Sequence, residues 1–187
     1  MNAQTRGRLI LLAIAAAFIL PVLAAVYLYF AEDGWRPQGD TQYGTLVVPP
    51  VTLPAATLAA VEPPPALREV WSMLVVAPED CAARCRESLV KIRQIRLSLG
   101  PKMTRMQTVL LTLNDQLEAE LREQHPRLVV ADPASSAGVM ALIDDYSDAQ
   151  ILLVDPFGNL MMRYPADADM AGIRKDLGQL LKLSTIG

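Results

Sequence analysis

The chain of 187 residues contains two cysteines, Cys81 and Cys85, in the sequence Cys-Ala-Ala-Arg-Cys. Cysteine thiolates are nucleophiles in thiol–disulfide exchange and ligands for soft metal ions. The apolar segment 69–77 precedes the pair and is typical of a buried strand. Asp80 belongs to the residue types that cap helices, and we expect a helix from Cys81 to about Leu99. The pair is therefore expected where a strand meets a helix, at the end of a parallel sheet where sites form.

One interpretation of the pair is thiol redox chemistry, in which Cys81 is the nucleophile and Cys85 resolves the mixed disulfide. The free amides at a helix N-terminus stabilise a thiolate. The charged neighbours act on the thiolate in opposite directions. Arg84 and Arg86 would stabilise it further, whereas Glu79 and Asp80 would destabilise it. The chain would then be a thiol–disulfide oxidoreductase.

A second interpretation is a site in which both thiolates hold a soft metal ion, Cu(I) above all. In an ideal helix the Cβ atoms of residues i and i+4 lie about 5–6 Å apart, whereas a disulfide needs roughly 3.5–4.5 Å. A disulfide would therefore require a looser first turn, and a bridging metal would strain that turn less. A third interpretation is a structural disulfide or two inert thiols. We favour a functional pair because of its expected place in the sheet.

The soluble part alternates strands and helices and then ends in a hairpin and a last helix. We expect strands at 69–77, 106–113, 128–130, 151–155 and 160–164, and helices at 81–99, 115–124, 135–143 and 168–183. The early alternation predicts parallel strands joined by right-handed crossovers. The turn at 156–159 adds an antiparallel hairpin. This is the layout of an α/β, thioredoxin-like fold, with a mixed central sheet flanked by helices.

An uncharged segment of 22 residues, 9–30, is long enough to cross a bilayer as a helix. Arg6 and Arg8 precede it, and Glu32 and Asp33 follow it. The positive-inside rule then places the N-terminus in the cytoplasm and the C-terminal domain on the periplasmic side of the inner (cytoplasmic) membrane. A cleaved signal peptide is the disfavoured alternative, because the apolar run is long and lacks a small-residue cleavage site.

Residues 31–65 contain seven of the 14 prolines, which favours an extended, semi-rigid spacer. Within it, residues 44–48 have the composition of a short edge strand that Pro49 and Pro50 are expected to end. We therefore predict three parts: a cytoplasmic stub and transmembrane helix at 1–30, a Pro-rich linker at 31–65 and a thioredoxin-like domain at 66–187.

The net charge of −3 gives no support for nucleic-acid binding, and two cysteines with one histidine cannot make a zinc finger.

Three features together resemble the Sco/SenC family: the strand followed by Cys-x-x-x-Cys, Val-Leu-Leu-Thr-Leu at 109–113, and Ile-Leu-Leu-Val-Asp-Pro-Phe-Gly-Asn-Leu at 151–160. Members of this family are membrane-tethered, thioredoxin-like proteins that help deliver copper to cytochrome c oxidase. The resemblance covers roughly residues 66 to 183. It implies a protein that assists oxidase assembly by thiol–disulfide exchange or Cu(I) transfer through Cys81 and Cys85. Its partners would be respiratory oxidase subunits or assembly factors.

The sequence departs from the family pattern at two positions. Ala82 stands where the family usually has a proline after its first cysteine. The family's third copper ligand, a histidine before the hairpin, falls at Ser147 when counted back from Asp155. Two thiolates hold Cu(I), whereas Cu(II) also prefers a nitrogen ligand, so any copper is expected as Cu(I). Thiol redox chemistry needs no histidine. The missing histidine therefore weakens the metal interpretation more than the redox interpretation.

Other residues that could act as ligands are better explained by the fold. His125 precedes the strand that begins at Leu128, so we expect a surface histidine at the opposite end of the sheet from Cys81. Met103 and Met106 are expected to fill the core, and Met161 and Met162 are expected in hairpin packing and at the surface. An alternative function is a non-catalytic module that binds a partner of the oxidase assembly machinery. A general extracytoplasmic oxidoreductase is disfavoured, because the Cys-x-x-Cys spacing is absent.

Overall fold

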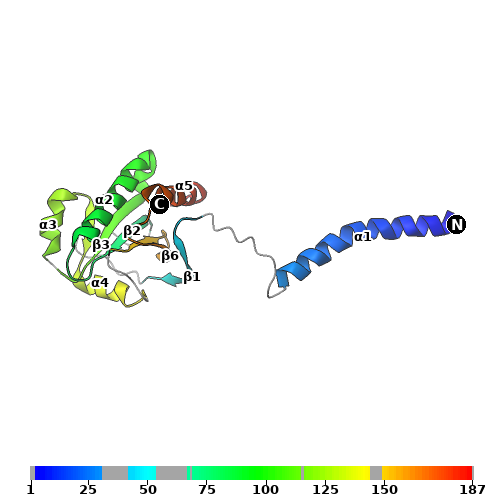
Figure 1. The fold of residues 1–187 in the computed structure, drawn as a ribbon, viewed down its shortest axis with the longest axis horizontal. Coiled ribbons are helices and arrows are strands. Elements are labelled where there is room, and N and C mark those ends of the chain that lie inside the picture. The colour runs from blue at the N-terminus through cyan, green and yellow to red at the C-terminus, as the bar shows by residue number, and fades with distance from the viewer. Residues whose placement is uncertain are drawn as a thin grey trace. The chain divides into compact units, whose positions relative to one another are not determined.

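The computed structural model describes residues 3–30, 42–53, 67, 69–114, 116–143 and 149–186. The chain divides into two compact units, Met1–Asp40 and Thr41–Gly187. The first unit contains a long helix, and the second contains a sheet with helices on both faces (Figure 1).

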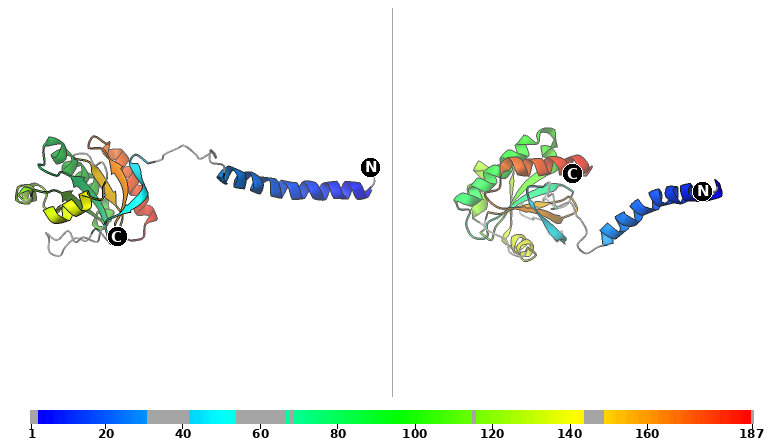
Figure 2. Two further views of the ribbon diagram at one scale, coloured as in Figure 1. Left: turned by 90° about the horizontal axis from the view of Figure 1, so that it is seen from below. Right: turned by 45° about the vertical axis from the view of Figure 1, so that its right-hand side comes forward.

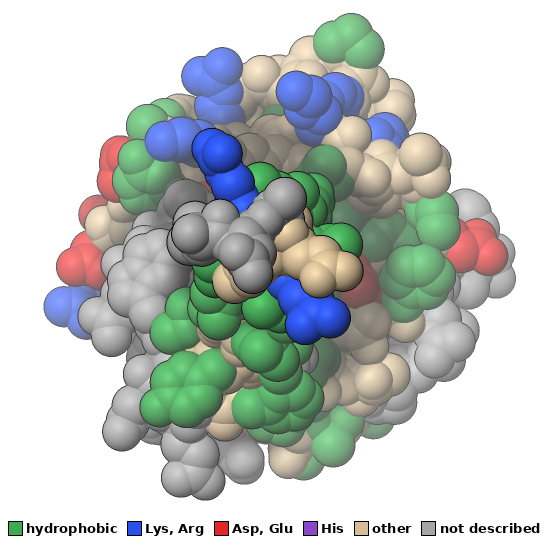
Figure 3. All heavy atoms as spheres, turned by 90° about the vertical axis from the view of Figure 1, so that its right-hand side faces the viewer, with side chains coloured by type: hydrophobic (Ala, Val, Ile, Leu, Met, Phe, Trp, Pro, Cys, Tyr) green, Lys and Arg blue, Asp and Glu red, His purple; other side chains and the backbone are tan. Residues whose placement is uncertain are grey.

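The helix of the first unit, α1 (Ala3–Phe30), is apolar on all sides. Its segment Gln4–Leu28 has 25 residues and contains an apolar window of 18 residues with a mean hydropathy of 2.9, none of which is buried. At 1.5 Å per residue, this segment is about 37 Å long, which exceeds the hydrocarbon core of roughly 30 Å. α1 is therefore a candidate membrane span, as expected from the sequence. Hydrophobic side chains are prominent among the atoms displayed in Figure 3.

The second unit is built on a six-stranded sheet with the order β1-β6-β5-β2-β3-β4. The strands are β1 (Thr45–Thr52), β2 (Trp71–Val76), β3 (Met106–Leu111), β4 (Leu128–Ala131), β5 (Ile151–Val154) and β6 (Asn159–Tyr164). Strands β2, β3 and β4 are parallel, whereas β5, β6 and β1 are each antiparallel to a neighbour. The predicted parallel strands and late antiparallel hairpin are confirmed.

Helices cover both faces of this sheet. They are α2 (Ala83–Ser98), α3 (Leu117–Gln124), α4 (Pro133–Met140) and α5 (Met170–Leu183), with a 3-10 helix η1 (Gly100–Arg105) after α2. Figures 1 and 2 show α4 on the opposite face of the sheet from α2 and α5. The mixed sheet flanked by helices that the sequence predicts is therefore present.

The central strand β2 is buried along its whole length because it faces both layers of helices. Successive side chains of a strand point to opposite faces. Met73 and Val75 accordingly join the core under α2 and α5, whereas Leu74 and Val76 join the core under α4. An unbroken apolar run in the sequence is thus the signature of this strand.

The expected edge strand at residues 44–48 is present as β1, but the expectation that Pro49 and Pro50 end it is wrong. β1 pairs with β6, and its register shifts between Leu46 and Val51, so both prolines lie inside this irregularity. Proline is tolerated at an edge or a bulge because no ladder amide is needed there. The residues of β1, which we assigned to the linker, are therefore part of the sheet. Residues 31–41 and 54–66 lie outside the described part, where the linker stays a prediction.

The buried carboxylate of Asp176, on α5, holds the segment before β1 to the domain. Its Oδ2 accepts hydrogen bonds from the backbone amides of Tyr43 (2.8 Å) and Gly44 (3.0 Å) and from the Tyr164 hydroxyl (3.1 Å). Burial raises the pKa of Tyr164, and the negative charge of Asp176 raises it further, so the phenol remains a donor. A side chain at Gly44 has no room, because its Cβ would lie 2.5 Å from the Tyr164 ring.

The expectation that His125 is a surface histidine is wrong, because the residue is only 6% exposed. It does lie just before β4, at the amino-terminal end of that strand, as predicted. Its backbone amide donates to Leu121 (2.8 Å), and its carbonyl accepts from Leu128 (2.9 Å). Burial lowers the pKa of His125, and the positive charge of Arg93 lowers it further.

We expect the free energy of unfolding to fall as the pH is lowered from about 7 to about 5, in part because of His125. The imidazole of the unfolded chain has a pKa near 6.5, and the folded value is lower, so the unfolded state binds the proton first. The contribution of the neutral imidazole is complete above the unfolded pKa and is lost as the pH falls toward the folded one. Chemical denaturation of the full chain in detergent measures the slope, and His125→Gln should flatten it. Equal slopes in both proteins would contradict the expectation.

Candidate functional site

Cys81 and Cys85 form a disulfide with a Cα–Cα distance of 5.0 Å. Helix α2 begins at Ala83, and its N-cap, Ala82, is extended and makes no side-chain capping bond. The predictions that the helix begins at Cys81 and that Asp80 caps it are therefore wrong. Because Cys81 precedes the helix, the helical i,i+4 spacing does not apply to the pair. The bridge closes without unwinding α2, and the looser first turn that we thought necessary is not required.

The disulfide lies at the carboxyl edge of the parallel strands. Cys81 follows the end of β2 by five residues, and the segment between them continues the ladder beside β3. The amide of Ala77 donates to Leu111 (2.9 Å), and the amide of Leu113 donates to Pro78 (2.9 Å). Open α/β sheets form their sites at this edge. This confirms the placement of the pair that the sequence predicts.

Both cysteines are buried, Cys81 with 3% and Cys85 with 0% of its surface exposed. They belong to the core under α2, together with Leu89 on the next turn of the helix and Ala149 before β5. Both sulfurs are therefore largely shielded from solvent, Cys81 slightly less than Cys85.

Arg86 connects the segment that carries Cys81 to helix α3. Its Nε donates to the carbonyl oxygen of Cys81 (3.1 Å), and its Nη2 forms an ion pair with Glu120. The guanidinium is thus engaged in holding the backbone of Cys81, and Glu120 offsets its charge. Arg84, by contrast, is exposed on the first turn of α2. We expected both arginines near the thiols. Among the described residues Arg86 forms an ion pair, and Arg84 forms none.

Sequence reasoning missed two residues beside the disulfide, Ser88 and Ala149. The Ser88 hydroxyl, one turn after Cys85, donates to the carbonyl of Ala149 (2.9 Å). Ala149 has a positive φ of 60°, and its amide donates to Val76 (2.8 Å). These bonds fix the start of β5 against α2 and β2. Ser88 could have been found from the sequence, because it is a polar residue among the apolar residues on the buried face of α2. No local sequence pattern identifies Ala149.

The ligands present fit a Cu(I) ion only when the pair is reduced, because neither sulfur of a disulfide is a thiolate. Among the described residues, His, Cys, Asp and Glu side chains form no group of three that could hold a metal ion. Ser147, where the resemblance places the third ligand, lies outside those residues. The reduced pair supplies two soft ligands, which suits Cu(I) and not Cu(II).

The remaining ligand candidates lie elsewhere. His125 lines a cavity that neither cysteine lines. Met106 opens β3 and is buried, so it lies at the amino end of that strand, opposite the disulfide. Met103 precedes it in η1. Met162, on β6, is buried and accepts a hydrogen bond from the Tyr164 hydroxyl (3.3 Å). Met161 packs against the core, as expected of hairpin packing, whereas the expectation of a surface position is wrong for Met162.

Comparison with known proteins agrees with this architecture. Similar solved structures include apo Sco1 of Thermus thermophilus, which is 19% identical with a TM-score of 0.58 over 75% of this chain and 97% of that chain. Copper-bound yeast Sco1 is 15% identical with a TM-score of 0.52 over 64% and 80% of the two chains. A putative thioredoxin of Neisseria meningitidis is 14% identical with a TM-score of 0.53 over 78% and 94%. At these identities the similarity establishes the fold, which is thioredoxin-like and shared with Sco1 proteins.

No curated protein matches the sequence. A protein-family model described as "Transmembrane-like, thioredoxin-like, C-terminal domain" matches residues 71–184. This range begins at β2, ends just after α5 and includes the disulfide. The chain therefore belongs to this family of transmembrane-like proteins with a thioredoxin-like C-terminal domain.

Proposed function

We propose that the chain is a membrane-anchored, extracytoplasmic protein that assists cytochrome c oxidase assembly by thiol–disulfide exchange through Cys81 and Cys85. The observation that carries the proposal is the disulfide between these residues at the carboxyl edge of a thioredoxin-like sheet. The link to oxidase assembly rests on the fold shared with Sco1 proteins and on the motifs that resemble the Sco/SenC family.

The exchange begins with the reduced pair. The Cys81 thiolate attacks one sulfur of a client disulfide, which forms a mixed disulfide and releases one client thiolate. The Cys85 thiolate then attacks Sγ of Cys81 and expels the second client thiolate. Two electrons pass from the pair to the client, the protons of the original dithiol end on the client thiols, and the Cys81–Cys85 bond remains. A dithiol donor resets the pair by the same chemistry in reverse.

The positions of the two sulfurs assign their roles. Cys81 precedes α2, a helix of 16 residues whose amino-terminal amides favour a negative charge. It is also the more exposed of the pair. Cys85 has no exposed surface, lies within the first turn of α2 and is within bonding reach of Cys81. Cys81 is therefore the nucleophile, and Cys85 resolves the mixed disulfide.

The anchor sets where this chemistry takes place. α1 is long and apolar enough to span a bilayer, and Arg6 and Arg8 lie near its amino end. Positive charges favour the cytoplasmic side, so the second unit would face the opposite, oxidising compartment. That compartment permits a disulfide to form.

A second candidate function, a partner-binding module without catalysis, is favoured by the burial of both sulfurs. In that case the bridge only stabilises the segment between β2 and α2. The redox and binding functions differ in what they require of the cysteines, since a binding module needs the surface and not the thiols.

We expect Cys85→Ser in the full chain to accumulate a covalent complex with a client, because nothing remains to resolve the mixed disulfide. Cys81→Ser should trap none, because the nucleophile is missing. Non-reducing electrophoresis of membranes from cells that express each variant measures the complex, and reductant should release it.

The matched control is Ser88→Ala, which keeps both thiols and alters the same helix. Equal trapping by the two cysteine variants would contradict the assignment of Cys81 as the nucleophile and Cys85 as the resolving cysteine. Full oxidase assembly by cells that carry only the Cys81→Ser/Cys85→Ser variant would reject the redox function in favour of the binding module.

Copper transfer makes a separate prediction for the reduced chain. The wild type should bind a single Cu(I) ion in competition with a chelator, because two thiolates suffice for this ion, and should bind Cu(II) weakly. The Cys81→Ser/Cys85→Ser variant should bind none at this site. Equal Cu(I) uptake by both proteins would remove copper as a cargo and leave thiol exchange as the chemistry of the pair.

A further inference from the structure

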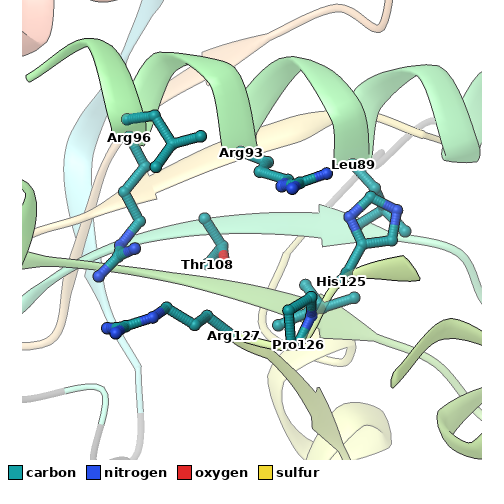
Figure 4. A pocket seen from close by; sticks show the side chains of 9 residues that line it. Leu89, Arg93, Arg96, Thr108, His125, Pro126 and Arg127 are labelled. Carbon is teal, nitrogen blue, oxygen red and sulfur yellow. The ribbon is translucent and has the colours of Figure 1, made fainter. Parts of the chain in front are cut away.

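A cavity of 190 Å³ lies between helix α2, strand β3 and the loop that joins α3 to β4 (Figure 4). Neither cysteine lines it, so it is distinct from the disulfide site. Its polar lining among the described residues consists of Arg93, Arg96, Thr108, His125 and Arg127, and none of the described lining side chains is acidic. The cavity is therefore a positively charged hollow within a chain whose net charge is −3.

The three arginines come from two separate parts of the chain. Arg93 and Arg96 are three residues apart on α2, a spacing that places side chains on one face of a helix. Arg127 lies directly before β4. In Figure 4 the guanidinium groups of Arg96 and Arg127 approach each other on one side of Thr108, while that of Arg93 extends toward His125. Within the described part of the chain, none of the three forms an ion pair.

Like charges face one another in this cavity, and no described acidic residue forms an ion pair with them. Besides burial, the positive charge of Arg127 lowers the pKa of Arg96, and that of Arg93 lowers the pKa of His125. Such pairs destabilise each other in a partly buried site, and an anion placed between them would offset the repulsion.

Hydrogen-bond donors around the cavity are free to receive such an anion. The Nε of Arg96 donates to the carbonyl of Met106 (2.7 Å), which fixes the side chain and leaves its terminal amino groups available. Thr108 and His125 are 5% and 6% exposed, and neither side chain is hydrogen-bonded to another described residue. Guanidinium groups bind phosphate in a fixed, often bidentate geometry.

We infer that this cavity binds a small phosphate ester. The arginines, with Thr108 and His125, would surround the phosphate oxygens, and Leu89, Leu97 and Leu128 would contact a short apolar group. The volume is below the range of about 300–1,000 Å³ that is usual for drug-sized ligands, so the ester is small. The inference does not depend on the chemistry of Cys81 and Cys85.

A second hollow provides a matched control for non-specific attraction of anions. It has a volume of 470 Å³ and is lined by Lys102, Arg174 and Lys175, all of which are exposed. Arg174→Gln/Lys175→Gln removes two positive charges, as Arg93→Gln/Arg127→Gln does in the first cavity. Arg93 and Arg127 are also exposed, so their replacement should leave the fold intact. Arg96 is left unchanged because it holds the backbone of Met106.

Isothermal titration calorimetry of the full chain in detergent tests the inference, with phenyl phosphate as the probe. Wild type should show saturable binding that is tighter than for inorganic phosphate, and phenol should not bind. Arg93→Gln/Arg127→Gln should bind at least about tenfold more weakly, since charge-assisted hydrogen bonds are lost. Arg174→Gln/Lys175→Gln and Cys81→Ser should bind as the wild type does.

The inference is overturned if wild type shows no saturable binding up to millimolar probe, or if the two double variants lose affinity equally. Loss of affinity only in Arg174→Gln/Lys175→Gln would move the site to the second hollow and also overturn it. A parallel titration with dihexanoyl phosphatidic acid distinguishes the source of the phosphate. Tighter binding of this lipid than of phenyl phosphate, again lost in Arg93→Gln/Arg127→Gln, would identify a lipid headgroup as the ester.

Discussion

The bond between Cys81 and Cys85 is the constraint on which the candidate site depends. The bond joins Cys81, which lies outside α2, to Cys85, which lies inside it, and the helix begins two residues later than the sequence indicates. The segment from β2 is held by backbone bonds to the end of β3, and Arg86 holds the carbonyl of Cys81. With both ends fixed, the two sulfurs meet at the edge of the sheet where chemistry is possible.

The sequence predicted the strands that have strong apolar runs and the helices between them. Residues 71–76, 106–111 and 151–154 lie in the centre of the sheet and are buried on both faces, which is why their composition alone identifies them. The placement of the cysteine pair followed from that order of elements. Asp80 was misassigned as a cap because α2 begins at Ala83, where Ala82 takes the N-cap position without a side-chain capping bond.

Other features depend on contacts between distant parts of the chain, and no local pattern reveals them. β1 passes through two prolines because it pairs on one side only, with β6. His125 is buried because the loop before β4 packs against α2. The positive φ of Ala149 is supported by bonds to Ser88 and Val76. In each case the partner lies far away in the sequence.

The fold separates two kinds of chemistry. The disulfide lies at the carboxyl edge of the parallel strands, whereas the basic cavity lies against α2 near the amino-terminal ends of β3 and β4. Family membership and the fold shared with Sco1 proteins describe the scaffold, but the proposed activity comes from the two sulfurs. Ser147 stands in the sequence where the resemblance places a third copper ligand, which supports thiol exchange more than metal transfer in that proposal.

The midpoint potential of the Cys81–Cys85 pair tests this account most directly. The full chain in detergent would be equilibrated with glutathione buffers, and its free thiols would be labelled and counted by mass. A pair that exchanges with clients should show a midpoint between about −120 and −270 mV, the range of catalytic dithiols. A midpoint below about −300 mV, as in structural disulfides, would contradict the account.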